Sequence, residues 1–256
     1  MNYANDSEKK ILSVTSYTRL HFGLICLNSK NYRIDGGSGL LTEIPSATID
    51  FYHGTTNSLT INNPIYDRIF SKYKSSLPYN IRINTIINQH CGLGTTTQIA
   101  LSIYSALNYL NHNPLHYDKK VFDVGRGGTS GIGIHSYNNG GFVIDGGHIW
   151  GSEKSTISPS NANTDLLSIS PLLFHCNFPN WKIVVIIPRH GKIISGNEER
   201  QFFQDNTPVD QKEIDHICKC LLMGVIPSLL TSDFLLFTES IEDSMHYGFN
   251  RKEILI

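Results

Sequence analysis

The sequence of 256 residues has little charge and no long apolar run. Charged residues make up 17% of it and the formal net charge is -1, so no overall field would attract nucleic acid or an acidic membrane surface. No apolar run approaches the roughly 20 residues that span a bilayer. The segment Met1 to Lys10 is polar and lacks the apolar core of a signal peptide. We therefore expect a globular protein without nucleic-acid or membrane partners.

Several catalytic and metal-binding patterns are also missing. The five cysteines are odd in number and form no C-x-x-C pair, which argues against a disulfide framework and favours the reducing cytoplasm. We find no H-E-x-x-H and no paired metal-ligand spacing, and Cys218 and Cys220 fall on different helix faces. A zinc site is therefore not expected. The absence of G-x-x-x-x-G-K-[ST] excludes an ordinary P-loop enzyme, and the absence of G-x-S-x-G argues against a serine hydrolase.

The glycines of the sequence occur in clusters, and the most informative cluster lies in His90–Ala100. The preceding segment, Ile81–Ile87, alternates in polarity and predicts a strand. Gly92 and Gly94 follow, and apolar residues at helical spacing then predict a helix over Gly94–Asn111. The order is strand, glycine loop and helix N-terminus, an arrangement that can hold a phosphate group through free backbone N–H groups.

Three hydroxyl side chains stand at the start of this helix: Thr95, Thr96 and Thr97. They can add hydrogen-bond donors to a phosphate site. The alternative is a purely structural helix start, capped by Thr95 or Thr96, with the glycines forming a turn.

A second glycine-rich region spans Val121–His148, with nine of the 21 glycines of the chain. Its loop Gly125–Gly131 combines backbone N–H groups with a cation and two hydroxyls, which suits an anion site. The residues expected to bind the anion are Arg126, Gly127, Gly128, Thr129 and Ser130. The alternative is a structural cluster of turns. Beyond the loop, we predict strands over Ser130–Tyr137 and Gly141–Asp145.

The remaining pattern predicts alternating strands and helices. Arg19 and His21 should face the same side of a strand, because they are two residues apart. The expected strands are two within Ile11–Leu27, then Ala47–Tyr52, Ser58–Ile61 and a buried strand over Trp181–Pro188. The expected helices are Ile65–Leu77, Asn197–Phe203, Thr207–Leu222 capped by Thr207, and Ser232–Met245, with Gly151–Asn163 as a linker.

Six segments in chain order carry a resemblance to a known family. The loop His90-x-Gly-Leu-Gly-Thr-Thr-Thr-Gln is similar to the phosphate loop of the GHMP kinase superfamily, Gly-Leu-Gly-Ser-Ser followed by a helix. Together with five others, it resembles a branch that is not a kinase, the beta-ribofuranosylaminobenzene 5'-phosphate synthase family. The other segments are Arg19-Leu-His-Phe-Gly-Leu, Arg33-Ile-Asp-Gly-Gly-Ser-Gly, Gly125-Arg-Gly-Gly-Thr-Ser-Gly-Ile-Gly, Gly140-Gly-Phe-Val-Ile-Asp-Gly-Gly-His and Ser195-Gly-x-x-Glu-x-x-x-Phe.

The resemblance implies a reaction. Phosphoribosyl pyrophosphate would condense with 4-aminobenzoate or a hydroxylated analogue, carbon dioxide and pyrophosphate would leave, and the product would serve a methanopterin-type cofactor. Mg²⁺ is the expected cofactor and ATP is not used. A ribosyl pyrophosphate has two phosphate ends, and the chain has two glycine-rich loops to receive them.

The resemblance also implies roles for residues. Gly92, Gly94 and Thr95 to Thr97 would bind one phosphate group, and the Gly125–Gly131 loop the other. Arg19, His21 and Arg33 would hold the aryl carboxylate or the 5'-phosphate. The expected catalytic set is Arg126, Asp145 and His21. Asp145 is the expected Mg²⁺ ligand, with Asp35 and Glu43 as further candidates.

For the fold, the resemblance implies an α+β protein of GHMP type. Residues 1–155 would form a ribosomal protein S5 domain 2-like half, and residues 156–256 a ferredoxin-like half. A homodimer is an assembly that the chain could form.

The sequence departs from the family pattern in two places. Thr96 stands where relatives have glycine, so a close backbone approach to phosphate is not expected there. A C-terminal segment like Gln-Ser-Ser-Trp-Gly-Pro-Thr has no match, which indicates a shortened relative. Two alternatives therefore stay open, an ATP-dependent small-molecule kinase of GHMP type and a non-catalytic ligand-binding relative.

Overall fold

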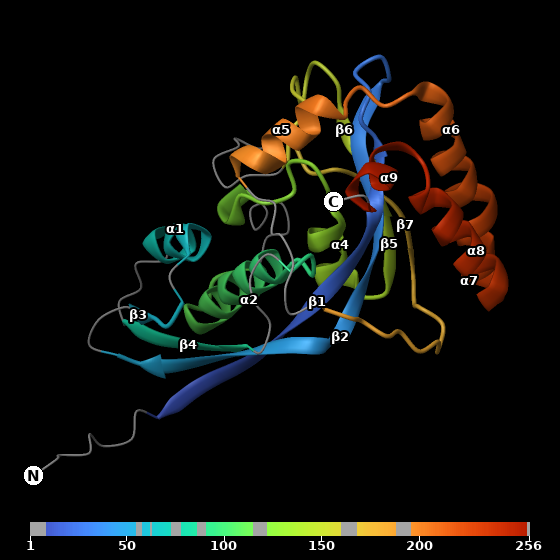
Figure 1. The fold of residues 1–256 in the computed structure, drawn as a ribbon. Helices are drawn as coiled ribbons and strands as arrows, with labels where there is room; N and C mark the ends of the chain where they lie inside the picture. Colours follow the sequence, from blue (N-terminus) through green and yellow to red (C-terminus); the bar gives the residue numbers. More distant parts are fainter. Residues whose placement is uncertain are drawn as a thin grey trace, which may run out of the picture.

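The computed structural model describes residues 9–54, 58–61, 63–72, 78–85, 91–114, 122–159, 168–187 and 196–254 (Figure 1). A seven-stranded sheet has the order β3-β4-β2-β5-β7, with β1 and β6 also paired to β2. The strands are β1 (Lys10–Cys26), β2 (Arg33–His53), β3 (Ser58–Leu59), β4 (Tyr79–Thr85), β5 (Phe142–Asp145), β6 (His148–Ile149) and β7 (Leu172–Cys176). The helices are α1 (Pro64–Lys72), α2 (Thr95–Leu110), α4 (Ile132–Asn139), α5 (Asn197–Asp205), α6 (Gln211–Cys220), the π-helical η1 (Leu221–Val225), α7 (Ile226–Thr231), α8 (Phe234–Met245) and α9 (Gly248–Ile254).

β2 is the strand to which most of the sheet is attached. β1 pairs with it antiparallel over nearly its whole length. The prediction of two strands in Ile11–Leu27 is wrong, since β1 is one strand whose pairing is interrupted by register shifts. β2 also pairs with β5 through Gly37–Leu40 and with β4 through Ala47–His53. Two segments far apart in sequence are thereby held by the same strand.

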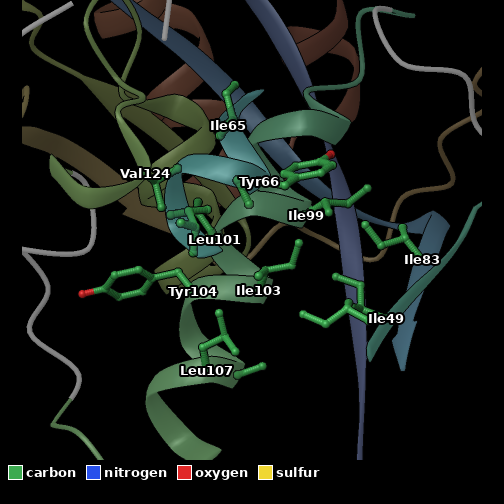
Figure 2. Close-up of a cluster of buried hydrophobic side chains, with 14 of the residues drawn as sticks. Ile49, Ile65, Tyr66, Ile83, Ile99, Leu101, Ile103, Tyr104, Leu107 and Val124 are labelled. Carbon is green, nitrogen blue, oxygen red and sulfur yellow. The ribbon is translucent and has the colours of Figure 1, made fainter. Parts of the chain in front are cut away.

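Helices cover both faces of this sheet. Figure 1 shows α1, α2 and α4 on one side and α6, α7 and α8 on the other. On the first side, Ile49 of β2 and Ile103 of α2 belong to one buried cluster (Figure 2). On the second side, the rings of Phe142 and Phe237 meet edge to face at 6.2 Å. A third cluster around Phe249 joins α5, α6 and α9 to β1.

The predicted order of strand, glycine loop and helix is confirmed by β4 and α2, although residues 86–90 lie outside the described part. α2 is almost wholly buried, so it forms the centre of the first layer. Its N-cap is Gly94, with φ of 63°, and no side chain caps it. The alternative of a cap by Thr95 or Thr96 is therefore wrong. A left-handed conformation at this position favours glycine.

The strand predicted over Ser130–Tyr137 is wrong, because most of this segment forms helix α4. Ile132, Ile134 and His135 are all buried, so the burial pattern follows neither the alternation of a strand nor the periodicity of an amphipathic helix. A short segment buried on several sides cannot be assigned by periodicity alone. The strand predicted beyond it is confirmed as β5.

The buried strand predicted over Trp181–Pro188 is also wrong. Residues 181–187 are described, and they form no ladder with the rest of the described chain. Val184 and Ile186 are each 84% exposed. An apolar run becomes a buried strand only when tertiary structure supplies a neighbour on each side.

The helix predicted over Thr207–Leu222 starts later and extends further. Asp210 caps it, and its carboxylate accepts a hydrogen bond from a backbone N–H at 2.8 Å, so the expected cap by Thr207 is wrong. α6, η1 and α7 run on as one stretch, Gln211–Thr231, which is long and apolar enough to cross a membrane by length and composition alone. Core helices of soluble proteins meet the same test, and this stretch contributes side chains to the second core cluster.

The other predicted elements are confirmed with shifted ends. The segments Ala47–Tyr52, Ser58–Ile61, Asn197–Phe203 and Ser232–Met245 overlap β2, β3, α5 and α8. The segment Ile65–Leu77 overlaps α1, and its residues 73–77 lie outside the described part of the chain. β7 pairs with β5, so the sheet continues beyond residue 155, and residues 196–254 are mainly helical. The division at 155 into two halves stays a prediction.

Candidate functional site

A cavity of about 360 Å³ lies where the two glycine-rich loops, β1 and the C-terminal helices meet. Both loops were predicted as anion sites, and the fold brings them to one place. The cavity is lined by Arg19, His21, Gly23, Leu24, Gly92, Thr97, Arg126, Gly127, Thr129, Ser130, Gly133, Ile134, Pro159, Glu199, Phe203, Met245 and Glu253.

Arg19 of β1 supports the first glycine loop. Its backbone N–H donates to the Leu93 carbonyl at 3.0 Å, and its guanidinium Nη1 donates to the Gly92 carbonyl at 2.7 Å. A Cβ at Gly94 would lie 2.8 Å from the Arg19 side chain, so Gly94 is required both by its φ and by this packing. Burial, followed by repulsion from Arg126, lowers the pKa of Arg19 to about 10. Arg19 therefore remains charged at neutral pH and places a cation against the loop.

The three threonines of this loop have different surroundings. Thr97 lines the cavity, and its Oγ1 accepts a hydrogen bond from Nε of Arg126 at 2.9 Å. Thr95 and Thr96 are buried and do not line the cavity. The bulk of Thr96, unexpected from the family pattern, thus lies away from the space where a ligand would sit.

Arg126 connects the second loop to the first. Beyond the bond to Thr97, it makes no further hydrogen bond to the described residues. Burial lowers its pKa, and attraction from Glu199 opposes that shift. The guanidinium keeps its charge and has terminal N–H groups that can donate to an anion in the cavity.

His21 and Ser130 form a hydrogen-bonded pair on the wall of the cavity. The Nδ1 atom of His21 accepts from the Gly23 N–H at 3.0 Å, so Nε2 carries the proton and donates to Ser130 Oγ at 2.9 Å. Burial and the charge of Arg19 lower the pKa of His21 to about 3, so the ring is neutral. Ser130 Oγ also accepts from the Ile132 N–H, which leaves its own O–H group to donate to a ligand.

Asp145 lies behind the second loop and does not line the cavity. Its carboxylate is fully buried and accepts from the backbone N–H groups of Gly131 at 3.0 Å and Gly147 at 2.9 Å. Burial raises its pKa to about 6, although these two hydrogen bonds oppose the shift. This geometry gives Asp145 the task of holding the loop and does not favour the predicted direct contact with Mg²⁺.

A second buried carboxylate, Asp35, supports the loop from further away. Lys154 Nζ lies 2.9 Å from Asp35 Oδ2, and His148 Nδ1 lies 3.0 Å from the same oxygen. Lys154 also donates to Thr129 Oγ1 at 3.2 Å, and that hydroxyl donates to the Ser158 carbonyl at 2.8 Å. The Thr129 proton is therefore already committed, so its expected role as a phosphate donor is not favoured.

Four other predicted residues lie outside the cavity. Arg33 donates to the carbonyls of Gly146 and Gly147 at 2.7 and 2.6 Å, so it is not brought to the phosphate loops. Gly94 and Gly128 do not line the cavity either. Glu43, a further Mg²⁺ candidate, is exposed on β2.

The cavity also contains two carboxylates that we did not predict. Glu199 is on α5 and Glu253 is on α9. The motif Ser195-Gly-x-x-Glu-x-x-x-Phe already contained Glu199 and its neighbour Phe203, but no sequence signal marked Glu253. α9 reaches the cavity because Asn250 Oδ1 accepts the Leu24 N–H of β1 at 2.9 Å.

The two carboxylates influence one another. Glu253 retains solvent-exposed surface, yet desolvation within the cavity, followed by repulsion from Glu199, raises its pKa to about 7. Two guanidinium groups and a hydroxyl donor thus share the cavity with two carboxylates. The arrangement can bind a polyanion, and its acidic pair can bind a hard cation beside that anion.

The chain is similar in sequence to archaeal synthases. It is 30% identical over 257 residues to beta-ribofuranosylphenol 5'-phosphate synthase of Methanocaldococcus jannaschii, covering 93% of this chain and 77% of that protein. It is 31% identical over 249 residues to the synthase of the same name from Archaeoglobus fulgidus, covering 95% and 78%. No family model matches the chain.

Solved structures share the fold at much lower identity. Phosphomevalonate kinase of Streptococcus pneumoniae aligns with a TM-score of 0.59 at 10% identity, covering 92% of this chain and 78% of that one. Mevalonate pyrophosphate decarboxylase of Streptococcus pyogenes aligns with a TM-score of 0.53 at 11% identity, covering 93% and 75%. These neighbours confirm the GHMP fold and the α+β class, and at this identity they establish the fold alone.

The structural role of Asp145 predicts a pH dependence of stability. Its folded-state pKa of about 6 exceeds the ordinary value of 3.8, so the folded state favours the protonated carboxyl. The resulting stabilisation is present below about pH 4 and is lost as pH rises through 6, a change of about 3 kcal/mol. Urea unfolding measures the unfolding free energy of the wild type and of Asp145→Asn at each pH. We expect the wild-type value minus the variant value to fall by about this amount between pH 4 and 7. A difference that stays flat over this range would contradict the assignment.

Proposed function

The chain belongs to the beta-ribofuranosylphenol 5'-phosphate synthase family, and we propose that it joins the ribosyl group of phosphoribosyl pyrophosphate to an aromatic acid, releasing carbon dioxide and pyrophosphate. Family membership makes it an enzyme of the pentosyltransferase type. The donor, the acceptor, the Mg²⁺ requirement and a place in methanopterin-type cofactor synthesis in the cytoplasm are the proposal.

One observation supports the donor more than any other. Two glycine-rich loops, each suited to an anion, line one cavity with the cations Arg19 and Arg126. Phosphoribosyl pyrophosphate has phosphate groups at both ends of a ribose and would match two anion sites in one cavity. Arg126 and the free O–H group of Ser130 would bind one end, and the N–H groups of the first glycine loop the other.

The acceptor is an aromatic carboxylic acid in this proposal. The relatives are named for a phenol product, which favours 4-hydroxybenzoate over 4-aminobenzoate. In either case, the ring carbon bearing the carboxylate attacks the anomeric carbon as its bond to pyrophosphate breaks. The electron pair of the bond to the carboxylate then restores the aromatic ring, and carbon dioxide leaves.

This chemistry needs charge stabilisation more than proton transfer. The carbon–carbon bond forms and the carboxylate leaves without removal of a ring proton, so no general base is required. A neutral His21, with its pKa held near 3, suits a role in positioning Ser130. Arg126 would stabilise the negative charge that grows on pyrophosphate in the transition state, and Arg19 would balance the charge of the other phosphate end.

Mg²⁺ fits the residues of the cavity. Glu199 and Glu253 offer hard oxygen ligands, and after desolvation the repulsion between these two carboxylates is the main cause that raises the pKa of Glu253. When bound, the ion would neutralise charge on the pyrophosphate. These two glutamates replace Asp145, Asp35 and Glu43 as our candidates to hold it.

The direct test combines the purified chain with Mg²⁺, phosphoribosyl pyrophosphate and either 4-hydroxybenzoate or 4-aminobenzoate labelled in the carboxyl group. We expect labelled carbon dioxide and pyrophosphate in equal amounts, faster with 4-hydroxybenzoate. Thermal stabilisation by ATP, with no carbon dioxide from either acid, would favour the kinase alternative. Stabilisation by phosphoribosyl pyrophosphate without turnover would favour a non-catalytic relative.

Arg126→Ala tests the anion site. Because one charged donor to the leaving group is lost, kcat/KM for phosphoribosyl pyrophosphate should fall by about 100- to 1,000-fold. Pyrophosphate release measures the rate, and thermal unfolding checks that the variant is folded. Arg82→Ala is a matched control, since Arg82 is exposed on β4 and packs over the Tyr52 ring at 4.5 Å. Unchanged turnover in Arg126→Ala would remove Arg126 from the site.

Glu253→Gln tests the cation site. With a pKa of about 7, Glu253 gains charge between pH 6 and 8, so the Mg²⁺ concentration for half-maximal activity should fall as pH rises through this range. The variant should need about tenfold more Mg²⁺ at pH 8 and lose most of this pH dependence. Glu198→Gln, an exposed neighbour on α5, serves as control. A Glu253→Gln profile identical to that of the wild type would exclude Glu253 as a ligand.

A further inference from the structure

A second group of potential ligand atoms lies on the helical layer formed by α6 and α8, outside the cavity described above. It consists of His216 and Cys220 of α6 and Asp243 of α8. Their ligand atoms, one nitrogen, one sulfur and one oxygen, all lie within 4.8 Å of one another. In the part of the chain that the structure describes, this is the one such group of three.

The three side chains already converge on one point. His216 Nε2 lies 2.8 Å from Asp243 Oδ2, and Cys220 Sγ lies 3.4 Å from the same oxygen. His216 and Cys220 are four residues apart, so one turn of α6 places them on the same face. In the sequence this His-x-x-x-Cys pair does not by itself indicate a metal site, because the third ligand is supplied by another helix.

The neighbourhood fixes the imidazole and leaves the group open to solvent. The ring of His216 stacks on that of Tyr247, with centroids 3.9 Å apart. Cys220 is buried, whereas the Asp243 side chain is 49% exposed. Cys220 is also the last residue of α6 before the π-helical η1, and π-helical turns often occur at functional sites. An ion could therefore reach the group from the carboxylate side.

We propose that His216, Cys220 and Asp243 bind a divalent transition-metal ion of the zinc class and thereby connect α6 to α8. In a tetrahedral zinc site, the sulfur and oxygen ligands are about 3.5 Å apart and the nitrogen and oxygen about 3.3 Å apart. The first separation already matches, and the second requires an opening of about half an ångström. Water would occupy the fourth position.

The ligand set determines which ions are expected. Imidazole and thiolate favour Zn²⁺ and Co²⁺, whereas Mg²⁺ and Ca²⁺ prefer oxygen ligands only. On binding, the Cys220 thiol releases its proton to solvent, and the His216 proton moves from Nε2 to Nδ1. The proposal concerns a different ion and a different face from the Mg²⁺ in the proposed function, so either can fail without the other.

Cobalt is the probe, because a thiolate ligand gives Co²⁺ a charge-transfer absorption in the near ultraviolet. Metal-free full-length protein is titrated with Co²⁺ in the presence of excess Mg²⁺. We expect this band to appear, to saturate at one ion per chain and to be abolished by Zn²⁺. A titration that produces no such band would overturn the proposal, because the three groups would then form only a hydrogen-bonded cluster.

Variants assign the band to these residues. Cys220→Ser should abolish it. Asp243→Asn should weaken Co²⁺ binding by more than about 100-fold, because loss of a residue that only hydrogen-bonds to a metal ligand already weakens binding by up to about that factor. Cys218→Ser is the matched control, since Cys218 is an exposed thiol on the same helix and is not in the group. The proposal fails if the band persists in Cys220→Ser or disappears in Cys218→Ser.

Thermal unfolding provides a readout that is independent of the spectrum. Because the ion would connect two helices only in the folded state, Zn²⁺ should raise the unfolding temperature of the wild type and of Cys218→Ser. Cys220→Ser should be folded without metal and should not respond to Zn²⁺. An equal response in all three proteins would mean that Zn²⁺ binds elsewhere.

Discussion

The contact of Arg19 with the first glycine loop is the interaction on which the candidate site depends. Through its backbone and its guanidinium, Arg19 holds two successive loop carbonyls, those of Leu93 and Gly92. Gly94 is the matching constraint, since a side chain there would need both a strained φ and the space that Arg19 occupies. The same residue thus fixes the backbone and supplies the cation.

The second loop is held in a different way, by buried carboxylates behind it. Asp145 fixes the backbone of Gly131, while Asp35 acts through Lys154 on Thr129. These two carboxylates, which we predicted as candidate metal ligands, therefore serve as a scaffold. Their full burial is tolerated because hydrogen bonds or a counter-ion satisfy each one. These contacts give the flexible glycine loop one defined shape.

Charge in the cavity is balanced across two parts of the chain. The cations come from β1 and the second loop, whereas Glu199 and Glu253 come from α5 and α9. A polyanion and a hard cation could therefore enter together without leaving a large excess of either sign. This arrangement supports a reaction in which a bound pyrophosphate leaves, and His21, held neutral, takes no part in the charge balance.

The sequence by itself determined the strand–loop–helix order around Gly94 and the family, and it predicted both loops as anion sites. These features rest on local chemistry, because glycine, hydroxyl and cationic residues act where they stand in the chain. Only the tertiary structure decided that both loops share one cavity, that α9 contributes Glu253, and that Trp181–Ile187 stays outside the sheet. Each of these depends on partners distant in sequence, and an apolar or acidic residue does not specify its partner.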